Sequence, residues 1–235
     1  MERVPEIGAM DSPEEVESYD QLSKRFLGLV EKKFIRRSLK LLTDKSVLKK
    51  SLILDVGTGT ANIPLLLISE FSMAGVVAVD LSLNMLKKAR SNIEEKGLEN
   101  RIFLVNADAE QLPFRSESFA LVISHSTIHH LPGPLQAVTE TVRVTRKGCR
   151  FIIRDLRRPP SYLLELYVQI FGLPYDRLMK KMYRESLHAG YSYKEMKSLS
   201  RKISGAVIKV RRFFITHVGL EGTRCDSDIF VGQDH

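Results

Sequence analysis

A glycine-rich turn directly after an apolar run is the first feature of this chain that predicts chemistry. The stretch "LILDVGTGTANIPLLL" has Asp55 near the end of the apolar run and Gly57 and Gly59 in the turn. Glycines let the backbone pass close beneath a ligand, because no Cβ stands in the way. The Lys and the following Ser or Thr that end the G-x-x-x-x-G-K-[ST] pattern of a phosphate-binding P-loop are missing here, which excludes a nucleoside triphosphatase.

The residues around the glycines also argue against a dinucleotide. A dinucleotide-binding turn has a third glycine, and this chain has Asn62 at that position. The carboxylate of Asp55 would repel a pyrophosphate, whereas it would favour a ligand that carries an ammonium group. The turn therefore favours a nucleoside that bears an amino acid.

Two further acidic residues end the next two apolar runs. Asp80 closes "VVAVD", and Asp108 comes just beyond "IFLVN". An acidic residue at the end of the second strand can accept hydrogen bonds from both ribose hydroxyls. Asp108 could accept a hydrogen bond from an adenine amino group. Each residue alone is a weak signal, but the ordered series predicts a nucleoside site.

Histidines follow the fourth apolar run, in "SHSTIHHLPG". This position predicts that they face the crevice where ligands of open sheets bind. His125 is the predicted general base or acceptor contact, and His129 is predicted either to take part in the site or to orient its loop. No carboxylate accompanies the histidines in the sequence, and no metal site is predicted.

The elements that must position these residues follow an alternating pattern. Near-continuous apolar runs predict buried strands at 52–56, 76–79, 102–105, 119–124 and 150–153, and helical stretches are expected at 61–71, 82–96 and 134–144. Such alternation predicts a parallel sheet with helices on both faces. Further along, "AVIKV" and "FFITHVGL" are predicted to form an antiparallel hairpin that closes the sheet.

The flanking segments predict a single domain. Ser12, Pro13 and Glu15 have the pattern of a helix start, and that helix is expected to run towards Leu29. We divide the domain 1–235 into cap helices at 1–45, a core at 46–156, an inserted helical lid at 157–190, a closing helix and hairpin at 191–222, and a tail at 223–235 whose order is left open.

The composition indicates a globular protein with reduced thiols. The chain has 235 residues, a formal net charge of +8 and two cysteines, without metal-ligand spacing. Together with an acidic N-terminus that does not look like a secretory signal, this predicts a cytoplasmic protein. "YLLELYVQIFGLP" is too short to span a bilayer. The basic charge would suit a nucleic acid, but a solvated lysine-rich surface is favoured, and no oligomeric state is predicted.

The ordered series "LDVGTGTANIPL", "VAVDLSLNML", "VNADAEQLPF", "SFALVISHSTIHHL" and "VRVTRKGCRFIIRDL" resembles the class I S-adenosylmethionine-dependent methyltransferases. It is most similar to their small-molecule branch, which includes the menaquinone and ubiquinone biosynthesis methyltransferases, and the resemblance covers roughly residues 45 to 155. It implies an α/β, Rossmann-like fold with a seven-stranded, mostly parallel sheet, helices on both faces and a C-terminal antiparallel hairpin.

The resemblance implies S-adenosylmethionine as the cofactor and a role for each matching residue. Gly57 and Gly59 would line its methionine part, with Asp55 near the ammonium. The other implied contacts are Asp80 for the ribose, Leu81 and Met85 packed near the adenine, Asp108 and Ala109 at the adenine edge, and Ser124 with His125 beside the methionyl group. Three residues depart from the family pattern: Ala61 stands where many members have a third glycine, Ala120 replaces a common aspartate, and His125 stands where Asn or another small polar residue is common.

The acceptor side carries a weaker signal. Arg154 ends the fifth strand facing the crevice, where it is predicted to bind an anionic acceptor or to pair with Asp155. Tyr162 and Tyr183 are the predicted acceptor contacts from the insertion after the fifth strand, which the family uses as a lid. The apolar character of this insertion predicts a small, apolar or aromatic acceptor that is methylated mainly through positioning in a dry cleft. Two alternatives stay open: an RNA or protein methyltransferase, suggested by the basic charge, and a noncatalytic cofactor-binding scaffold, suggested by the lack of a clear acceptor motif.

Overall fold

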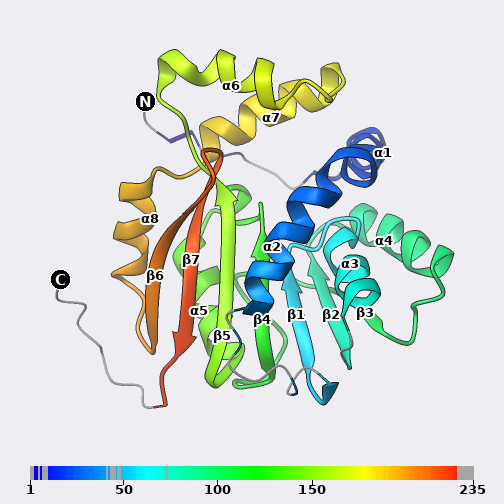
Figure 1. The fold of residues 1–235 in the computed structure, drawn as a ribbon, viewed down its shortest axis with the longest axis vertical. Helices are drawn as coiled ribbons and strands as arrows, with labels where there is room; N and C mark the ends of the chain where they lie inside the picture. The colour runs from blue at the N-terminus through cyan, green and yellow to red at the C-terminus, as the bar shows by residue number, and fades with distance from the viewer. Residues whose placement is uncertain are drawn as a thin grey trace.

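The computed structural model describes residues 3, 4, 6, 10–40, 42, 46, 49–71 and 74–226. Within this part of the chain, seven strands form one sheet in the order β3-β2-β1-β4-β5-β7-β6 (Figure 1). The strands are β1 (Leu52–Val56), β2 (Gly75–Asp80), β3 (Ile102–Asn106), β4 (Phe119–His125), β5 (Thr145–Leu156), β6 (Ala206–Phe213) and β7 (His217–Arg224).

The strand pairing confirms the predicted fold. β1 pairs in parallel with β2 and β4, and the parallel ladder continues from β2 to β3 and from β4 to β5. β7 runs in the opposite direction to the other strands of this sheet, so it pairs antiparallel with both of its neighbours, β5 and β6. The predicted closing hairpin is therefore β6–β7, and it enters the sheet with its second strand next to β5.

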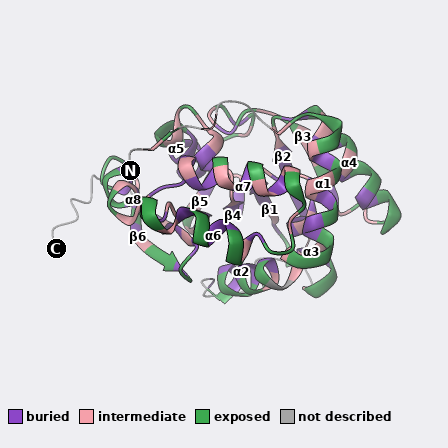
Figure 2. Ribbon diagram, turned by 90° about the horizontal axis from the view of Figure 1, so that it is seen from above, coloured by how far each residue is buried: buried purple, intermediate pink, exposed green. Residues whose placement is uncertain are grey.

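Helices cover both faces of the sheet, which explains the near-continuous apolar strands. On one face, α5 (Pro134–Val144) covers β4 and β5, and α8 (Tyr193–Ser200) covers β6 and β7; both share a buried cluster with Leu54 and Val56 of β1. On the other face, α2 (Gly28–Lys40), α3 (Asn62–Glu70) and α4 (Leu83–Glu95) share a second buried cluster with Ile53. Figure 2 shows the sheet as a buried layer between these helices.

The N-terminal helices form one bent unit. α1 (Pro13–Leu22) begins at the predicted capping box, in which Ser12 Oγ accepts from Glu15 N at 3.2 Å and Glu15 Oε2 accepts from Ser12 N at 3.3 Å. A π-helical turn, Ser23–Leu27, then joins α1 to α2 without a break. The cap helices predicted within 1–45 are thus continuous, and they run past the carboxyl ends of β1 and β4 (Figure 1).

The segment after β5 forms the predicted helical insertion. It contains α6 (Leu164–Phe171) and α7 (Arg177–Ala189), which lie above the carboxyl ends of the strands (Figure 1). β7 continues to Arg224, two residues beyond the predicted boundary, and residues 227–235 of the tail lie outside the described residues. In the described part of the chain, none of the helices has the length and apolarity needed to cross a bilayer.

Candidate active site

A large cavity lies where the parallel strands end, between the N-terminal helices and the α6–α7 insertion. Its volume is about 1130 Å³. Ligand pockets commonly measure about 300–1,000 Å³, so this cavity has room for a nucleoside cofactor and a second molecule. Its lining comes from the glycine turn, from the ends of β2, β3, β4 and β5, from the turn before β7, and from α1, α2 and α7.

The glycine turn depends on the absence of side chains. Gly57 and Gly59 have φ angles of +74° and +55°, a region that L-residues rarely adopt. Both line the cavity, and a Cβ on Gly57 would collide with the side chain of Thr127. Ala61, which replaces the family's third glycine, keeps the left-handed conformation with φ +65° and is fully buried.

Asp80 is fixed at the end of β2 with its carboxylate in the cavity wall. Its Oδ2 accepts from Gly59 N at 2.8 Å and its Oδ1 accepts from Ser82 N at 2.9 Å. Burial raises the pKa of Asp80, while these backbone hydrogen bonds oppose the rise. Each carboxylate oxygen can accept a second hydrogen bond, so the group remains able to hold ribose hydroxyls.

Most of the other predicted cofactor contacts share this end of the cavity. Leu81, Met85, Asp108 and Ala109 all line it. Asp108 turns one carboxylate oxygen back to its own loop, where Oδ1 accepts from Glu110 N at 2.8 Å. The structure therefore brings together residues from three strand ends, as the ordered motifs predict.

Asp55 and Ser124 lie behind the lining rather than in it. Asp55 Oδ2 accepts from Thr58 Oγ1 at 2.7 Å, which ties the glycine turn to β1. Burial raises the pKa of Asp55 to about 7, and the hydrogen bond from Thr58 opposes this rise. Asp55 Oδ1 and Ser124 Oγ are buried and have no hydrogen-bond partner among the described residues.

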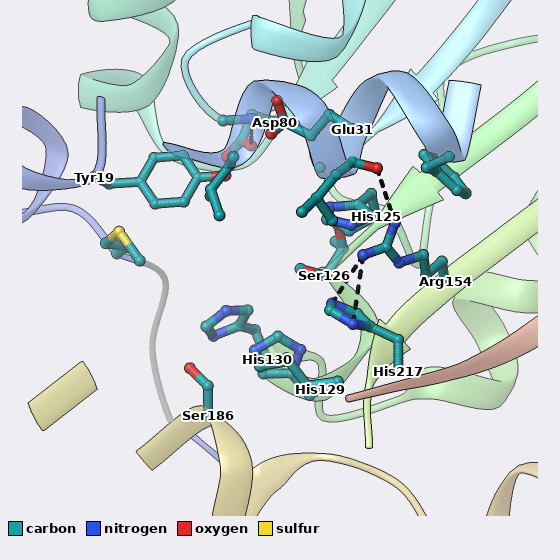
Figure 3. Close-up of a pocket in the computed structure, with 18 of the residues that line it drawn as sticks. Tyr19, Glu31, Asp80, His125, Ser126, His129, His130, Arg154, Ser186 and His217 are labelled. Carbon is teal, nitrogen blue, oxygen red and sulfur yellow. Dashed lines mark hydrogen bonds between the residues drawn. The ribbon is translucent and has the colours of Figure 1, made fainter. Parts of the chain in front are cut away.

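The opposite end of the cavity is built around one buried cation. Arg154 is only 5% exposed and lies beside His125 and His217 (Figure 3). His125 and Arg154 are register partners on β4 and β5, and Arg154 Nη2 lies 3.4 Å from both ring nitrogens of His217. Burial lowers the pKa of Arg154 to about 10, with the nearby Glu31 opposing, so the guanidinium stays charged at neutral pH.

His125 is held neutral by its surroundings. Burial, and then the charge of Arg154, lower its pKa well below the ordinary value. Its ring packs against Phe34, with centroids 5.1 Å apart, and its Nε2 has no hydrogen-bond partner among the described residues. The unpaired nitrogen of this neutral imidazole can accept a hydrogen bond or a proton from a bound acceptor, while burial and Arg154 disfavour a charge on the ring.

His129 is oriented by Asp155 at the end of β5. Its Nδ1 lies 2.5 Å from Asp155 Oδ1, and its backbone N donates to Asp155 Oδ2 at 3.1 Å. Burial opposes a charge on His129, but Asp155 raises its pKa above the ordinary value. No carboxylate stands near these histidines in the sequence, and the fold supplies two, Asp155 and Glu6.

The two predicted tyrosines of the insertion have different positions. Tyr183 lines the cavity, with its ring centroid 5.2 Å from that of Tyr175 in an edge-on contact. Tyr162 is 83% exposed and does not line the cavity, because it lies in the 3₁₀ turn before α6.

Several lining residues carried no sequence signal. Tyr19 of α1, Glu31 of α2 and His217 of β7 stand far from every recognised motif, yet all three line the cavity. Tyr19 lies over the glycine turn, 3.4 Å from where a Cβ on Gly59 would stand. Only the packing of distant segments brings these residues to the site.

Comparison with known protein families agrees with this geometry. Residues 54–153 match the family model described as a methyltransferase domain. The demethylmenaquinone methyltransferase of Lactiplantibacillus plantarum is 29% identical over 147 residues, which is 60% of this chain and 60% of that protein. The demethylmenaquinone methyltransferase of Listeria monocytogenes is 27% identical over 189 residues, 78% of each chain.

Solved structures share the fold over nearly the whole chain. An S-adenosylmethionine-dependent methyltransferase of Methanococcus maripaludis has a TM-score of 0.71 at 16% identity and covers 95% of this chain and 97% of its own. One from Aquifex aeolicus has a TM-score of 0.65 at 18% identity, over 91% and 98% of the two chains. The chain therefore has a methyltransferase-domain match over residues 54–153 and shares its fold with S-adenosylmethionine-dependent methyltransferases. In sequence it resembles the demethylmenaquinone methyltransferases.

Proposed function

We propose that this protein transfers a methyl group from S-adenosylmethionine to a small acceptor with an apolar body and a polar or anionic head. One observation carries the proposal: a single cavity has the strand-end carboxylates Asp80 and Asp108 at one end and the buried Arg154 at the other. The cofactor and the acceptor can therefore meet inside one cavity.

At the cofactor end, the fixed carboxylate of Asp80 would bind the ribose, and Asp108 with Ala109 would contact the adenine. Leu81 and Met85 supply apolar surface beside them, and Gly57 and Gly59 leave room for the methionyl part. Because Asp55 and Ser124 lie behind the lining, we assign them a supporting role. Asp55 fixes the turn through Thr58.

At the acceptor end, positioning would be the main source of rate. When bound, the cofactor supplies an electrophilic methyl group on a sulfonium. Holding an acceptor in line with such a group is worth about 7–11 kcal/mol. His125 would remove a proton from the acceptor, a contribution of roughly 10²–10⁴-fold, and Arg154 would stabilise the negative charge left on it.

The apolar side chains of the α6–α7 insertion favour an acceptor with an apolar body. Tyr175, Met179, Met182 and Tyr183 line the cavity from the insertion, and Phe34 lines it from α2. Apolar walls with a few polar groups are typical of small-molecule sites. The relatives named for demethylmenaquinone make that compound, oxidised and reduced, the first acceptor to test.

Calorimetry and a labelled-methyl assay would test the proposal. We expect S-adenosylmethionine and S-adenosylhomocysteine to bind one to one and NAD not to bind. Labelled methyl should then appear on demethylmenaquinone or on another apolar acceptor with an ionisable hydroxyl or carboxyl group, and not on RNA or protein. Binding of NAD without either adenosyl ligand, or transfer only to macromolecules, would contradict the proposal.

A further inference from the structure

Three potential metal ligands from distant segments converge at one wall of the cavity. Glu6, His129 and His130 each offer a ligand atom, and these atoms all lie within 4.8 Å of one another. We infer that the three residues form a binding site for a divalent transition-metal ion of the Zn²⁺ type. This inference is independent of the methyl acceptor.

The spacing of the ligand atoms fits one small ion. Glu6 Oε2 lies 3.5 Å from His130 Nδ1 and 3.8 Å from His129 Nε2. Two ligands bound to Zn²⁺ at about 2.0–2.2 Å in tetrahedral geometry lie roughly 3.3–3.6 Å apart. The two distances from Glu6 are therefore within a few tenths of an ångström of bonding geometry, and the two histidine ligand atoms lie within 4.8 Å of each other.

Each end of the ligand set has a supporting contact. Asp155 Oδ1 lies 2.5 Å from Nδ1 of His129, which directs that ring's Nε2 towards Glu6. Metal-binding histidines usually donate their other ring N–H to a carboxylate in this manner. Ser186 Oγ donates to Glu6 Oε2 at 2.9 Å, and His130 Nδ1 is buried without a hydrogen-bond partner among the described residues.

The backbone next to Glu6 is anchored on the same wall. Arg3 Nε donates to Ala189 O at 2.7 Å, Arg3 Nη2 donates to His129 O at 3.0 Å, and Val4 N donates to His188 O at 3.3 Å. The Arg3 guanidinium also stacks on Tyr191, 4.5 Å from the ring centroid. These contacts hold the segment that carries Glu6 against the histidine loop and α7.

The ligand types select the ion and leave a position free. Two imidazoles and one carboxylate suit Zn²⁺ and similar first-row ions rather than Mg²⁺ or Ca²⁺, which prefer oxygen ligands. Three protein ligands leave a fourth position for water or a ligand oxygen. His129, His130 and Ser186 line the cavity, so that position would be reached from it (Figure 3).

Metal titration of the tag-free full-length protein would test the site. We expect Zn²⁺ to bind one to one, and Co²⁺ to bind at the same site with the visible absorption of a tetrahedral ion without cysteine. Glu6→Gln and His130→Ala should each weaken Zn²⁺ binding at least tenfold. Asp155→Asn should weaken it about 10–100-fold, as is usual for a residue that orients a ligand.

The matched control is His217→Ala, which removes a cavity histidine outside the group and should leave Zn²⁺ affinity within about twofold. Thermal unfolding and S-adenosylhomocysteine binding would establish that Glu6→Gln and His130→Ala are folded. Absence of one-to-one binding at micromolar Zn²⁺, or equal affinity in the wild type and these two folded variants, would overturn the inference. A cobalt spectrum with sulfur charge-transfer bands would also overturn it, since it would place the ion on Cys149 or Cys225.

Discussion

The two ends of the cavity are built in different ways. The cofactor end uses backbone and short side chains that directly follow β1, β2 and β3, in chain order. The acceptor end combines residues from α2, β4, β5 and β7 with the α6–α7 insertion, and its charged group, Arg154, is nearly fully buried. The first end is a property of consecutive strand–turn–helix units, whereas the second exists only after the whole sheet has assembled.

The largest effect is expected at the cofactor end. Asp80→Ala should weaken S-adenosylhomocysteine binding at least a hundredfold, because two charged hydrogen bonds to ribose are worth about 1.5–3 kcal/mol each. The substitution also removes the acceptor of the Gly59 and Ser82 backbone N–H groups. Calorimetry measures the change, and Glu94→Ala, an exposed carboxylate on α4, is the control. An unchanged dissociation constant in a folded Asp80→Ala protein would count against the assignment.

The second-largest effect is expected on the pH dependence of stability, and it concerns Glu31, which lies between the cofactor end and the acceptor end of the cavity. Glu31 accepts from Asn62 beside the glycine turn and lies near Arg154, and burial raises its pKa to about 7. Between pH 4.5 and 7 the folded state keeps a proton that the unfolded state releases, so stability falls as the pH rises. Above pH 7 the loss approaches about 3 kcal/mol.

Glu31→Gln removes this dependence, so the variant should gain stability relative to the wild type when the pH changes from 5 to 8. Urea unfolding at the two pH values measures the difference. Glu17→Gln is the control, since Glu17 is exposed and its pKa is lowered by Lys88. A Glu31→Gln stability difference that is the same at pH 5 and pH 8 would show that Glu31 ionises normally.

The smallest effect is expected from Arg154→Met, and it should be confined to the acceptor end. Loss of a charged hydrogen bond to the acceptor, worth about 1.5–3 kcal/mol, should lower kcat/KM roughly 10–100-fold. The dissociation constant of S-adenosylhomocysteine should change by less than about twofold. Steady-state kinetics and calorimetry separate the two, with Arg90→Met on the exposed face of α4 as the control. Equal losses in both measurements would remove the distinction between the two ends.

The fold was predictable because each strand is short, apolar and followed by a turn signal. β1 and α5 have their predicted boundaries, and β2, β3 and β4 differ by one or two residues. β5 is longer than predicted: it starts at Thr145, which pairs with Phe119 of β4, and its last residues, to Leu156, pair with β7. Pairing with partner strands, which no local pattern encodes, thus extends it at both ends.

The predicted site residues also differ in how far local sequence patterns decided their positions. Seven of the nine predicted cofactor residues line the cavity, because each lies at the end of a strand or in a turn whose position could be predicted from the sequence. Asp55 and Ser124 lie behind the lining, since a side chain near a strand end can point into the sheet as well as out of it. Tyr162 is exposed because it lies in the 3₁₀ turn before α6, and the apolar pattern of the insertion does not specify how that turn is oriented.

The sequence by itself determined the parallel sheet, the glycine turn and the acidic residues at successive strand ends, because these depend on periodicity and on neighbours along the chain. Only the tertiary structure decided which histidines meet Arg154, that Asp155 orients His129, and that Glu6 reaches His130. Those contacts join segments distant in sequence, and burial then sets the protonation of the groups it encloses.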